Sequence, residues 1–335
     1  MLAALTTLVD SQLFILGEPV AKLEADVAAL SRAKHAIGCA SGTDALLLAL
    51  RAMDIGRGDE VITTPFTFFA TAGTIHNVGA TPVFADIDPL TFNIDPAAAK
   101  AAVTPRTKAV MPVDLFGQMA PIECFRQMMP TIPCIEDAAQ SIGARRTIDG
   151  KATMAGEVAT IGTFSFFPSK NLGGYGDGGM IVTQDDRLAE RLRRLRVHGG
   201  LKTYYHDEVG YNSRLDALQA EVLRIKLPHL EGWSEARRKN AAYYNEALKD
   251  IPEIVTPFVD PKNVTIVNQY TIRAQRRDEL QKHLNAKKVG NSIYYPLPLH
   301  RQPCFEYLGY RAGSMPQAEL ASREVISLPV YPELA

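Results

Sequence analysis

Apolar residues along this 335-residue chain follow two spacings, which alternate over most of its length. Short β-branched runs predict strands, and runs whose apolar residues recur every three or four positions predict helices between them. The expected strands are 60–64, 82–85, 108–113, 132–136, 158–167 and 180–183, and the expected helices are 19–30, 68–78, 96–103, 121–129 and 186–196. Such alternation is typical of an α/β protein with a mostly parallel sheet flanked by helices on both faces.

The pattern changes after about residue 263. Before that point, long helices are expected at 210–227 and 231–248, and Ser213 and Asp216 have the spacing of a capping box in the first of them. Beyond it, we expect strands at 268–274 and 292–296 and helices at 277–286 and 316–326. The sequence therefore predicts two domains: a large α/β domain over residues 1–230, which begins with an N-terminal helix, and residues 231–335, which hold a long connecting helix and a small α+β domain.

Composition excludes several classes of protein. The 36 basic and 37 acidic residues nearly cancel, so the charge predicts neither a nucleic-acid-binding nor a membrane-seeking face. The apolar start of the chain lacks a basic region and contains Asp10, which predicts a packed helix instead of a signal peptide. We expect a cytoplasmic protein with reduced thiols and no metal site, because no CxxC pair or metal-like spacing joins its four cysteines, Cys39, Cys124, Cys134 and Cys304.

The segment from Ile161 to Met180 carries the strongest candidate chemistry. A strand-like run stops at Pro168, and Lys170 follows just before five glycines at positions 173 to 179. Such a turn places the amine in a glycine-lined pocket, where desolvation lowers the pKa of a lysine towards the neutral form that attacks carbonyl groups. Lys170 is therefore a candidate Schiff-base nucleophile, and a solvated surface lysine is the alternative.

Two other segments offer what a phosphate-bearing aldehyde cofactor needs. Ser41, Gly42 and Thr43 precede a helix, where they form either an anion cradle or an ordinary N-cap. Asp137 follows the strand at 132–136, at the edge of a parallel sheet where sites form. It is either a cap or a buried carboxylate that keeps a pyridine nitrogen protonated. Together with Lys170, these parts match a pyridoxal phosphate site.

Seven motifs in the same order resemble the DegT/DnrJ/EryC1/StrS family of pyridoxal-phosphate-dependent sugar aminotransferases. They are SGTDAL (41–46), TPFTFFATAGTI (64–75), PVFADID (82–88), EDAAQSIGA (136–144), FSFFPSKNLGGYGDGGM (164–180), GYNSRLDALQA (210–220) and YYPLPLHRQPCF (294–305). The resemblance spans nearly the whole chain. It implies fold type I, the aspartate aminotransferase fold, with a large domain and a small C-terminal domain.

The resemblance also implies roles for individual residues. Lys170 would form the Schiff base with pyridoxal 5'-phosphate (PLP) and then move a proton between the donor carbon and the cofactor, whose pyridinium nitrogen Asp137 would hold. The other expected cofactor contacts are Phe68 on the ring face, Gln140 near the ring hydroxyl, and Gly42, Thr43 and Ser165 on the phosphate. Phe66 and Phe69 are expected to pack in the core instead.

The same resemblance implies how substrate and subunits meet. Asn212 would reach the phosphate bound by the other subunit, which implies a homodimer with shared active sites. Asn268, Tyr295 and His300 would line the sugar side, and for His300 a purely structural role is at least as good an explanation. Many members have VHLYG or VSLYG where this chain has VDLFG, and Asp114 in that segment has no role by resemblance.

The implied reaction moves an amino group from L-glutamate to a keto group of a nucleotide-linked sugar in amino-sugar biosynthesis. The NQYTI and YYPLPLH segments look most like members acting on 3-keto sugars, including UDP-linked N-acetyl sugars. A 4-keto sugar aminotransferase is one alternative. A sugar dehydratase using the pyridoxamine form is another, but dehydratases commonly replace the Schiff-base lysine with histidine, and Lys170 is present.

Two further alternatives come from different classes of protein. A regulatory protein would be expected to carry a helix-turn-helix or a basic stripe, and the sequence shows neither. An amino-acid aminotransferase would need an arginine for the donor carboxylate, and Arg273, Arg276 and Arg277 lie in an otherwise sugar-type pattern. No motif encodes the nucleotide or the stereochemistry of the new amine.

Overall fold

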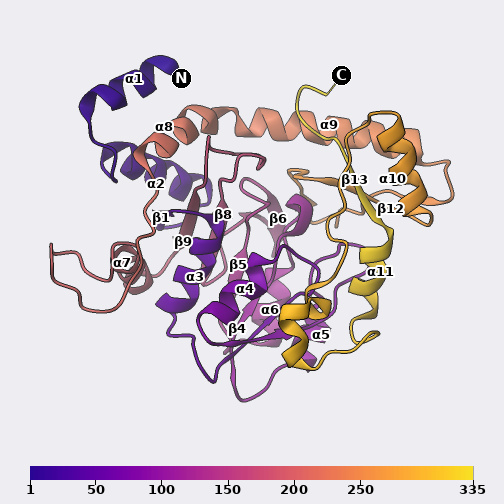
Figure 1. Cartoon of the computed structure of the whole chain (residues 1–335), viewed down its shortest axis with the longest axis horizontal. Coiled ribbons are helices and arrows are strands. Elements are labelled where there is room, and N and C mark those ends of the chain that lie inside the picture. Colours follow the sequence, from indigo (N-terminus) through magenta and orange to yellow (C-terminus); the bar gives the residue numbers. More distant parts are fainter. Residues whose placement is uncertain (335) are drawn as a thin grey trace.

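A single twisted sheet forms the centre of the computed structural model, which describes residues 1–334 (Figure 1). Its strand order is β1-β9-β8-β5-β4-β2-β3, because bridges from Val110 to Cys134 and from Val113 to Asp137 join two hydrogen-bonded groups of strands. β9 runs antiparallel to both of its neighbours, and the other strands are parallel to one another. The strands are β1 (His35–Cys39), β2 (Glu60–Thr63), β3 (Thr81–Phe84), β4 (Thr107–Met111), β5 (Ile135–Asp137), β8 (Ile161–Ser165) and β9 (Gly179–Thr183).

Helices cover both faces of this sheet. They are α1 (Leu2–Ser11), α2 (Glu18–Leu30), α3 (Gly42–Ala52), α4 (Ala70–Asn77), α5 (Pro96–Ala101), α6 (Ile122–Met128), α7 (Asp186–Leu195) and α8 (Ala217–Lys226). Successive strand residues point to opposite faces. Ile181 of β9 therefore packs with α3 and α7, whereas its neighbours Met180 and Val182 pack with α2 and α8. The prediction of a mostly parallel, helix-flanked sheet is confirmed.

The C-terminal part is built on α9 (Leu230–Leu248), which runs along the top of Figure 1 away from α8. A small antiparallel sheet follows, composed of β10 (Ile254–Val255), β12 (Tyr270–Ala274) and β13 (Val325–Leu328), with α10 (Arg277–Ala286) and α11 (Pro316–Glu324) beside it. This part is joined back to the large sheet. The Gln317 and Ala318 amides donate to the Asp86 carboxylate, both at 2.9 Å, and the Leu299 amide donates to the Pro65 carbonyl at 2.7 Å. The domain boundary at residue 230 stays a prediction.

Two predicted elements in this region are wrong. Residues 292–296 form no strand, since only Ser292 pairs with β13, through Ser327. The helix predicted at 316–326 ends at Glu324, because Val325 already lies in the small sheet against Arg273. In both places the pairing partner is distant in the sequence, so local spacing could not reveal it.

The expected capping box is also wrong, and one hairpin was not predicted. α8 begins only at Ala217, and the Ser213 hydroxyl donates to Asp44 of α3 at 2.7 Å. The hairpin consists of β6 (Arg145–Ile148) and β7 (Lys151–Met154), and β11 (Asn263–Val264) pairs with β6. Asp149 and Gly150 both have positive φ at its turn, so the Asp-Gly pair was a usable hairpin signal.

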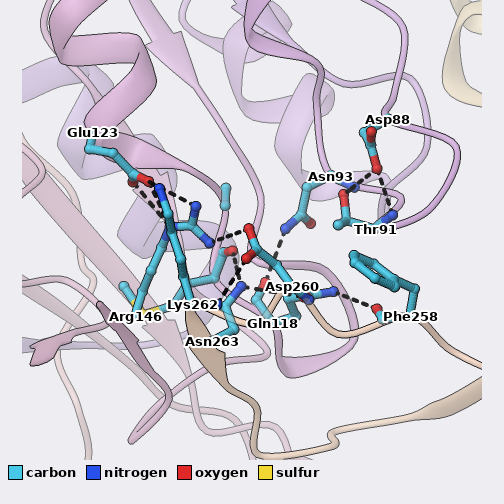
Figure 2. A network of polar contacts seen from close by, with 12 residues as sticks. Asp88, Thr91, Asn93, Gln118, Glu123, Arg146, Phe258, Asp260, Lys262 and Asn263 are labelled. Atoms are coloured by element: carbon cyan, nitrogen blue, oxygen red, sulfur yellow. Dashed lines mark hydrogen bonds and ion pairs between the residues drawn. The ribbon is translucent and has the colours of Figure 1, made fainter. Parts of the chain in front are cut away.

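A buried ion-pair network fastens the chain after α9 to α6 and to the β6–β7 hairpin (Figure 2). Arg146 of β6 is 3% exposed and lies between Glu123 of α6, at 2.8 Å, and Asp260, at 2.9 Å. Gln118 completes the network by accepting from the Asp260 amide at 2.6 Å and donating to the Phe258 carbonyl at 3.1 Å. Although burial lowers the pKa of Arg146, the hydrogen bonds that its guanidinium donates to both carboxylates hold that pKa above its ordinary value.

Candidate active site

Lys170 lies in the turn that leaves the carboxyl end of β8. Its amide donates to the Phe167 carbonyl at 2.9 Å and closes the turn. The chain then passes so close to itself that a Cβ at Gly173 would collide with the Pro168 carbonyl, which explains why glycine is needed there. Burial lowers the pKa of Lys170 to about 8, against the opposing effect of the Asp137 charge. About a tenth of the amine is therefore neutral at pH 7, far more than for an ordinary lysine.

Asp137 is buried at the end of β5, which pairs with β8, the strand whose following turn carries Lys170. Its carboxylate accepts from the Thr71 hydroxyl at 2.8 Å and from the Ala139 amide at 3.3 Å. Burial raises the pKa of Asp137, while those two donors and the charge of Lys170 act in the opposite direction. Such a carboxylate is most stable as an anion when a cation lies against it.

The amino end of α3 forms the expected anion cradle. Ser41 caps the helix by accepting from the Asp44 amide at 3.0 Å. Within residues 1–334 the amides of Gly42 and Thr43 have no hydrogen-bond acceptor, and they point outward at the positive end of the helix. A Cβ on Gly42 would lie 2.6 Å from the Cβ of Ser165, so Gly42 and the end of β8 are in direct contact. The cradle and the lysine turn therefore border one another.

Gln140 and Tyr295 are brought together on the other side of Asp137. The Gln140 side chain accepts from the Phe116 amide at 2.6 Å and donates to the Tyr295 hydroxyl at 3.3 Å. Burial raises the pKa of Tyr295, whose hydroxyl also faces the charge of Asp137. The structure thus places one predicted cofactor residue and one predicted substrate residue in contact.

The aromatic residues before α4 separate into two environments. Phe66 is fully buried, and its ring packs edge-on against Tyr295 at 5.9 Å between centroids. Phe69 stacks on Phe305 at 5.6 Å between centroids but is 46% exposed, so the expectation of core packing is confirmed for Phe66 and wrong for Phe69. Phe68 is 59% exposed and free to cover a bound ring.

The remaining predicted residues lie at different distances from this centre. Asn212 is exposed and lines an open cavity of about 600 Å³ with Ser41 of its own chain, outside the Lys170 turn. Asn268 is 9% exposed and borders a polar cavity of about 240 Å³ with Ser169, the neighbour of Lys170. The Oδ1 atom of Asn268 is buried without a hydrogen-bond partner in the described chain.

His300 is held by a structural partner. Its Nε2 atom lies 3.0 Å from a Glu319 carboxylate oxygen of α11, and its ring packs edge-on against Phe84 and Tyr310. The side chain is 2% exposed. The structural explanation of His300 is therefore the one that the contacts favour, and its predicted place on the sugar side gains no support from the geometry.

Three polar residues at this centre were not predicted to act there: Thr71, which holds Asp137, and Glu136 and Asp114, two fully buried carboxyl groups behind it. Thr71 is one of several threonines around the start of α4, so nothing in the sequence distinguishes it. Asp114 follows β4, and Glu136 lies within β5. Only the pairing of these two strands brings the two residues together.

The residues fit pyridoxal phosphate. The outward amides of α3 and Ser165 would hold the phosphate, and the desolvated amine of Lys170 would bind the aldehyde carbon. Asp137, which forms no ion pair within 4.0 Å in the described chain, would hold a proton on the ring nitrogen. Each part comes from a different strand end of one sheet. This arrangement defines a pyridoxal-phosphate-dependent enzyme of the α/β class.

The chain belongs to the DegT/DnrJ/EryC1/StrS aminotransferase family, whose sequence profile matches residues 1–335. It is 54% identical over 340 residues to a pleiotropic regulatory protein of Geobacillus stearothermophilus, covering 100% of this chain and 90% of that protein. It is 45% identical over 336 residues to UDP-N-acetyl-3-dehydro-alpha-D-glucosamine 3-aminotransferase of Acidithiobacillus ferrooxidans, covering 100% and 89%. The crystal structure of S. venezuelae DesV in complex with a ketimine intermediate matches with a TM-score of 0.96 at 41% identity, covering 99% and 89%. The predictions of family, fold type and cofactor are confirmed.

These residues divide the work of amino transfer. When bound, the cofactor supplies an electron-withdrawing ring that stabilises negative charge on the α carbon of the amino donor. Asp137 would favour the protonated ring nitrogen, and the neutral Nζ of Lys170 would be the base that accepts the α proton. Among residues 1–334, none of the helices is both long and apolar enough to cross a membrane.

Proposed function

We propose that this protein transfers an amino group from L-glutamate to the C3 keto group of a UDP-linked N-acetyl sugar. The observation that carries the reaction class is the desolvated amine of Lys170 beside the buried carboxylate of Asp137 and the anion cradle of α3. The name of the Acidithiobacillus ferrooxidans relative supports the sugar and the C3 position. It gives no support to the 4-keto alternative.

The regulatory alternative has one argument in its favour, the name of the 54% identical relative. The site argues against it. A protein that only regulates has no need to bury Lys170 and lower its pKa, or to bury Asp137 without an ion pair, since both cost stability. The dehydratase alternative is likewise opposed by Lys170 itself.

The sugar side of the proposed site is the polar cavity of about 240 Å³ beside the Lys170 turn. Asn268 and Tyr294 line it, and the buried Oδ1 of Asn268 lacks a partner in the described residues. Sugar hydroxyls and amides would satisfy such groups, and a few convergent polar atoms of this kind are what orients a small ligand. Asn268 therefore remains a proposed substrate residue, and Tyr295, which does not line this cavity, remains one because of its contact with Gln140.

The proposed assembly is a homodimer with shared active sites. Asn212 adjoins a segment whose large apolar residues are exposed: Leu201 by 64%, Tyr204 by 91% and Val209 by 82%. Apolar groups gathered in this way are typical of a protein interface. A second copy covering them would bring Asn212 towards the cradle of its partner.

A spectroscopic titration tests the reaction. The purified protein is loaded with pyridoxal phosphate, and its visible absorbance is followed after L-glutamate is added with no sugar present. Conversion of the visible band to the pyridoxamine spectrum establishes the donor half-reaction, with D-glutamate as the control. A panel of UDP- and dTDP-linked 3-keto and 4-keto sugars then identifies the acceptor that restores the band. A stable band in L-glutamate would contradict the proposed donor.

Subunit mixing tests the shared site. Lys170→Ala and Asn212→Asp should each be inactive, the second because a carboxylate would repel the phosphate. In a mixed dimer, the intact lysine of one subunit would meet the intact asparagine of the other. Mixing the two variants should restore about a quarter of the wild-type activity, and no recovery after verified subunit exchange would contradict a shared site.

A further inference from the structure

Three carboxyl groups meet behind the predicted cofactor site, and the reaction explains only one of them. Asp137 faces Lys170, whereas Glu136, its neighbour on β5, points to the other face of the sheet. There Glu136 meets Asp114, which follows β4. The side chains of both residues are 0% exposed. Buried carboxyl groups are normally hydrogen-bonded, so each oxygen atom of this pair is expected to have a partner.

Asp114 accepts two ordinary hydrogen bonds. Its Oδ1 accepts from the Ala120 amide at 2.7 Å, and its Oδ2 accepts from the Ser141 hydroxyl at 2.7 Å. It also hydrogen-bonds to the carboxyl group of Glu136. No lysine, arginine or histidine forms an ion pair with Asp114 among residues 1–334. Its surroundings therefore stabilise a single negative charge through neutral donors only.

Glu136 has fewer donors than Asp114. Its Oε2 accepts from the Gly156 amide at 3.0 Å, while Oε1 is buried and has no N–H or O–H donor in the described chain. The carboxyl group of Asp114 is its remaining partner. Two carboxylate groups cannot form a hydrogen bond to each other unless one of them carries a proton.

We propose that Asp114 and Glu136 share one proton across a single hydrogen bond, and that this pair is a positioning device for Asp137 and Gln140. Burial, and then the charge of Asp114, raise the pKa of Glu136 well above its ordinary value. Burial also raises the pKa of Asp114, to about 6. Glu136 is accordingly the group that holds the proton, and Asp114 carries the negative charge.

The pair lies where two site-bearing loops meet. Asp114 joins them, because Ala120 ends the loop after β4 and Ser141 lies in the turn after β5. The first loop presents the Phe116 amide to Gln140, and the second carries Gln140 itself. The backbone of Asp114 also donates to the Asp137 carbonyl at 3.0 Å. A second negative charge on the pair would push the carboxyl groups apart and displace both site residues.

Other titratable groups face the pair. The Asp137 carboxylate raises the pKa of Asp114, and both members of the pair raise that of the buried Cys134 thiol, after the effect of burial itself. Lys170 acts on Asp137 from the opposite face. Arg126 is the one positive group that acts on Cys134, and no positive charge contributes to the pKa shifts of Asp114 or Glu136, so the charges that act on the pair favour keeping the shared proton.

Infrared spectroscopy tests the proton directly. At pH 7.5 the wild-type protein should show a carboxylic acid C=O stretch that Glu136→Gln lacks. Asp137→Asn serves as the comparison, because it should retain the band if the proton belongs to the pair. The absence of any band that depends on Glu136 would overturn the proposal.

The pH dependence of stability gives a second test. The pKa of Glu136 is higher in the folded protein than in the unfolded chain. Its contribution to the free energy of unfolding is therefore fully present below about pH 4.5 and is lost as the pH rises towards the folded-state pKa. Glu136→Gln cannot titrate, and its amide can still donate to Asp114. The unfolding constant of the wild type relative to this variant should therefore rise by up to about tenfold per pH unit over that interval. A constant ratio from pH 5 to pH 9 would overturn the proposal.

Glu60→Gln is the matched control. Glu60 is also a buried glutamate on a strand, but Arg106 and Thr104 outweigh burial and lower its pKa. Its ionised form is therefore the stabilising one, and that contribution is lost only as the pH falls. Glu60→Gln should be less stable than the wild type at pH 7, with a difference that stays constant above about pH 6.

The positioning role has its own readout. The rate at which L-glutamate bleaches the cofactor band is measured against pH in the wild type and in Glu136→Gln. Loss of the shared proton should produce an alkaline decline in the wild type that moves to higher pH in the variant. Equal slowing at every pH would mean that the pair is only structural. If L-glutamate gives no reaction at all, the donor assignment fails, while the infrared and stability tests still decide the proton.

Discussion

Two buried clusters of charge in this molecule are built on opposite plans. The network of Figure 2 places Arg146 between the Glu123 and Asp260 carboxylates, with ion-pair distances of 2.8 and 2.9 Å. At the active site, Asp137 faces one amine, Lys170, which forms no ion pair in the described chain, while the carboxyl groups of Asp114 and Glu136 meet on the opposite face of the sheet. One cluster contains its own counter-charges, and the other lacks them.

The difference shows what each cluster is for. Paired charges such as those of Arg146 hold two segments in register, and removing one partner leaves an uncompensated buried charge. Unpaired groups shift their pKa values instead, and the shifted groups are the ones that bind a charged cofactor and exchange protons. The charged groups of the active site therefore contribute less to stability than those of the Arg146 network.

The largest expected effect is that of Lys170→Ala. Turnover should fall by about 10⁴-fold or more, because the nucleophile and the base are both lost. The free energy of unfolding should stay the same or rise, since a desolvated amine is removed. Steady-state kinetics and urea unfolding check this, with Lys239→Ala on the exposed face of α9 as control. Activity close to wild type would contradict the role of Lys170.

Asp137→Asn should come next, with a loss of about 10³-fold in the donor half-reaction. An amide favours the unprotonated ring, which stabilises negative charge poorly. Cofactor binding should persist through the cradle of α3. Single-turnover kinetics measure the rate, and Thr71→Val, which removes only a donor to Asp137, should give a smaller loss in the same direction. An unchanged rate would show that Asp137 is merely structural.

Arg146→Ala should affect the other cluster alone. The free energy of unfolding should fall by about 3–5 kcal/mol, because two carboxylates lose their buried cation. Near neutral pH and below the unfolding temperature, the cofactor spectrum and the rate with L-glutamate should be unchanged. Urea unfolding measures the free energy of unfolding, and the absorbance titration measures the cofactor spectrum and the rate with L-glutamate. A changed spectrum in the folded variant would show that the clusters are coupled.

The smallest effects separate two residues that resemblance placed together. Asn268→Ala should raise KM for the sugar by about tenfold, equivalent to about 1.4 kcal/mol, with little change in stability. His300→Gln should lower stability by about 1 kcal/mol and leave KM unchanged, because its partner is Glu319. Parallel kinetics and thermal unfolding compare the two variants. A raised KM in His300→Gln would return that residue to the sugar side.

Local signals predicted the parts of the site that lie within one segment. Lys170 follows a strand and precedes glycines, Ser41 caps a helix, and Asp137 ends a strand, so spacing alone located each of them. The resemblance added Gln140 and Tyr295, and the structure places these two in contact. The main sheet and its helices were predictable for the same reason, since their apolar periods are strong.

Contacts between distant segments were beyond such signals. Thr71 reaches Asp137 across 66 positions, and Ser213 reaches Asp44 across 169, so a local pattern assigned Ser213 to the wrong helix end. The pair of Asp114 and Glu136 depends on which strands are neighbours. Residues 292–296 looked like a strand by composition, yet their environment allows only one bridge to β13.

The attachments of the C-terminal part have a mechanical consequence. With α9 as the sole connection, the small sheet could rotate relative to the large sheet. The hydrogen bonds from α11 to Asp86 and from Leu299 to Pro65, together with the network at Arg146, add three separate anchor points along its length. A body held at four places resists hinge rotation unless several anchors release at once. The part of the chain that carries Asn268 is thus expected to keep its position relative to the large sheet.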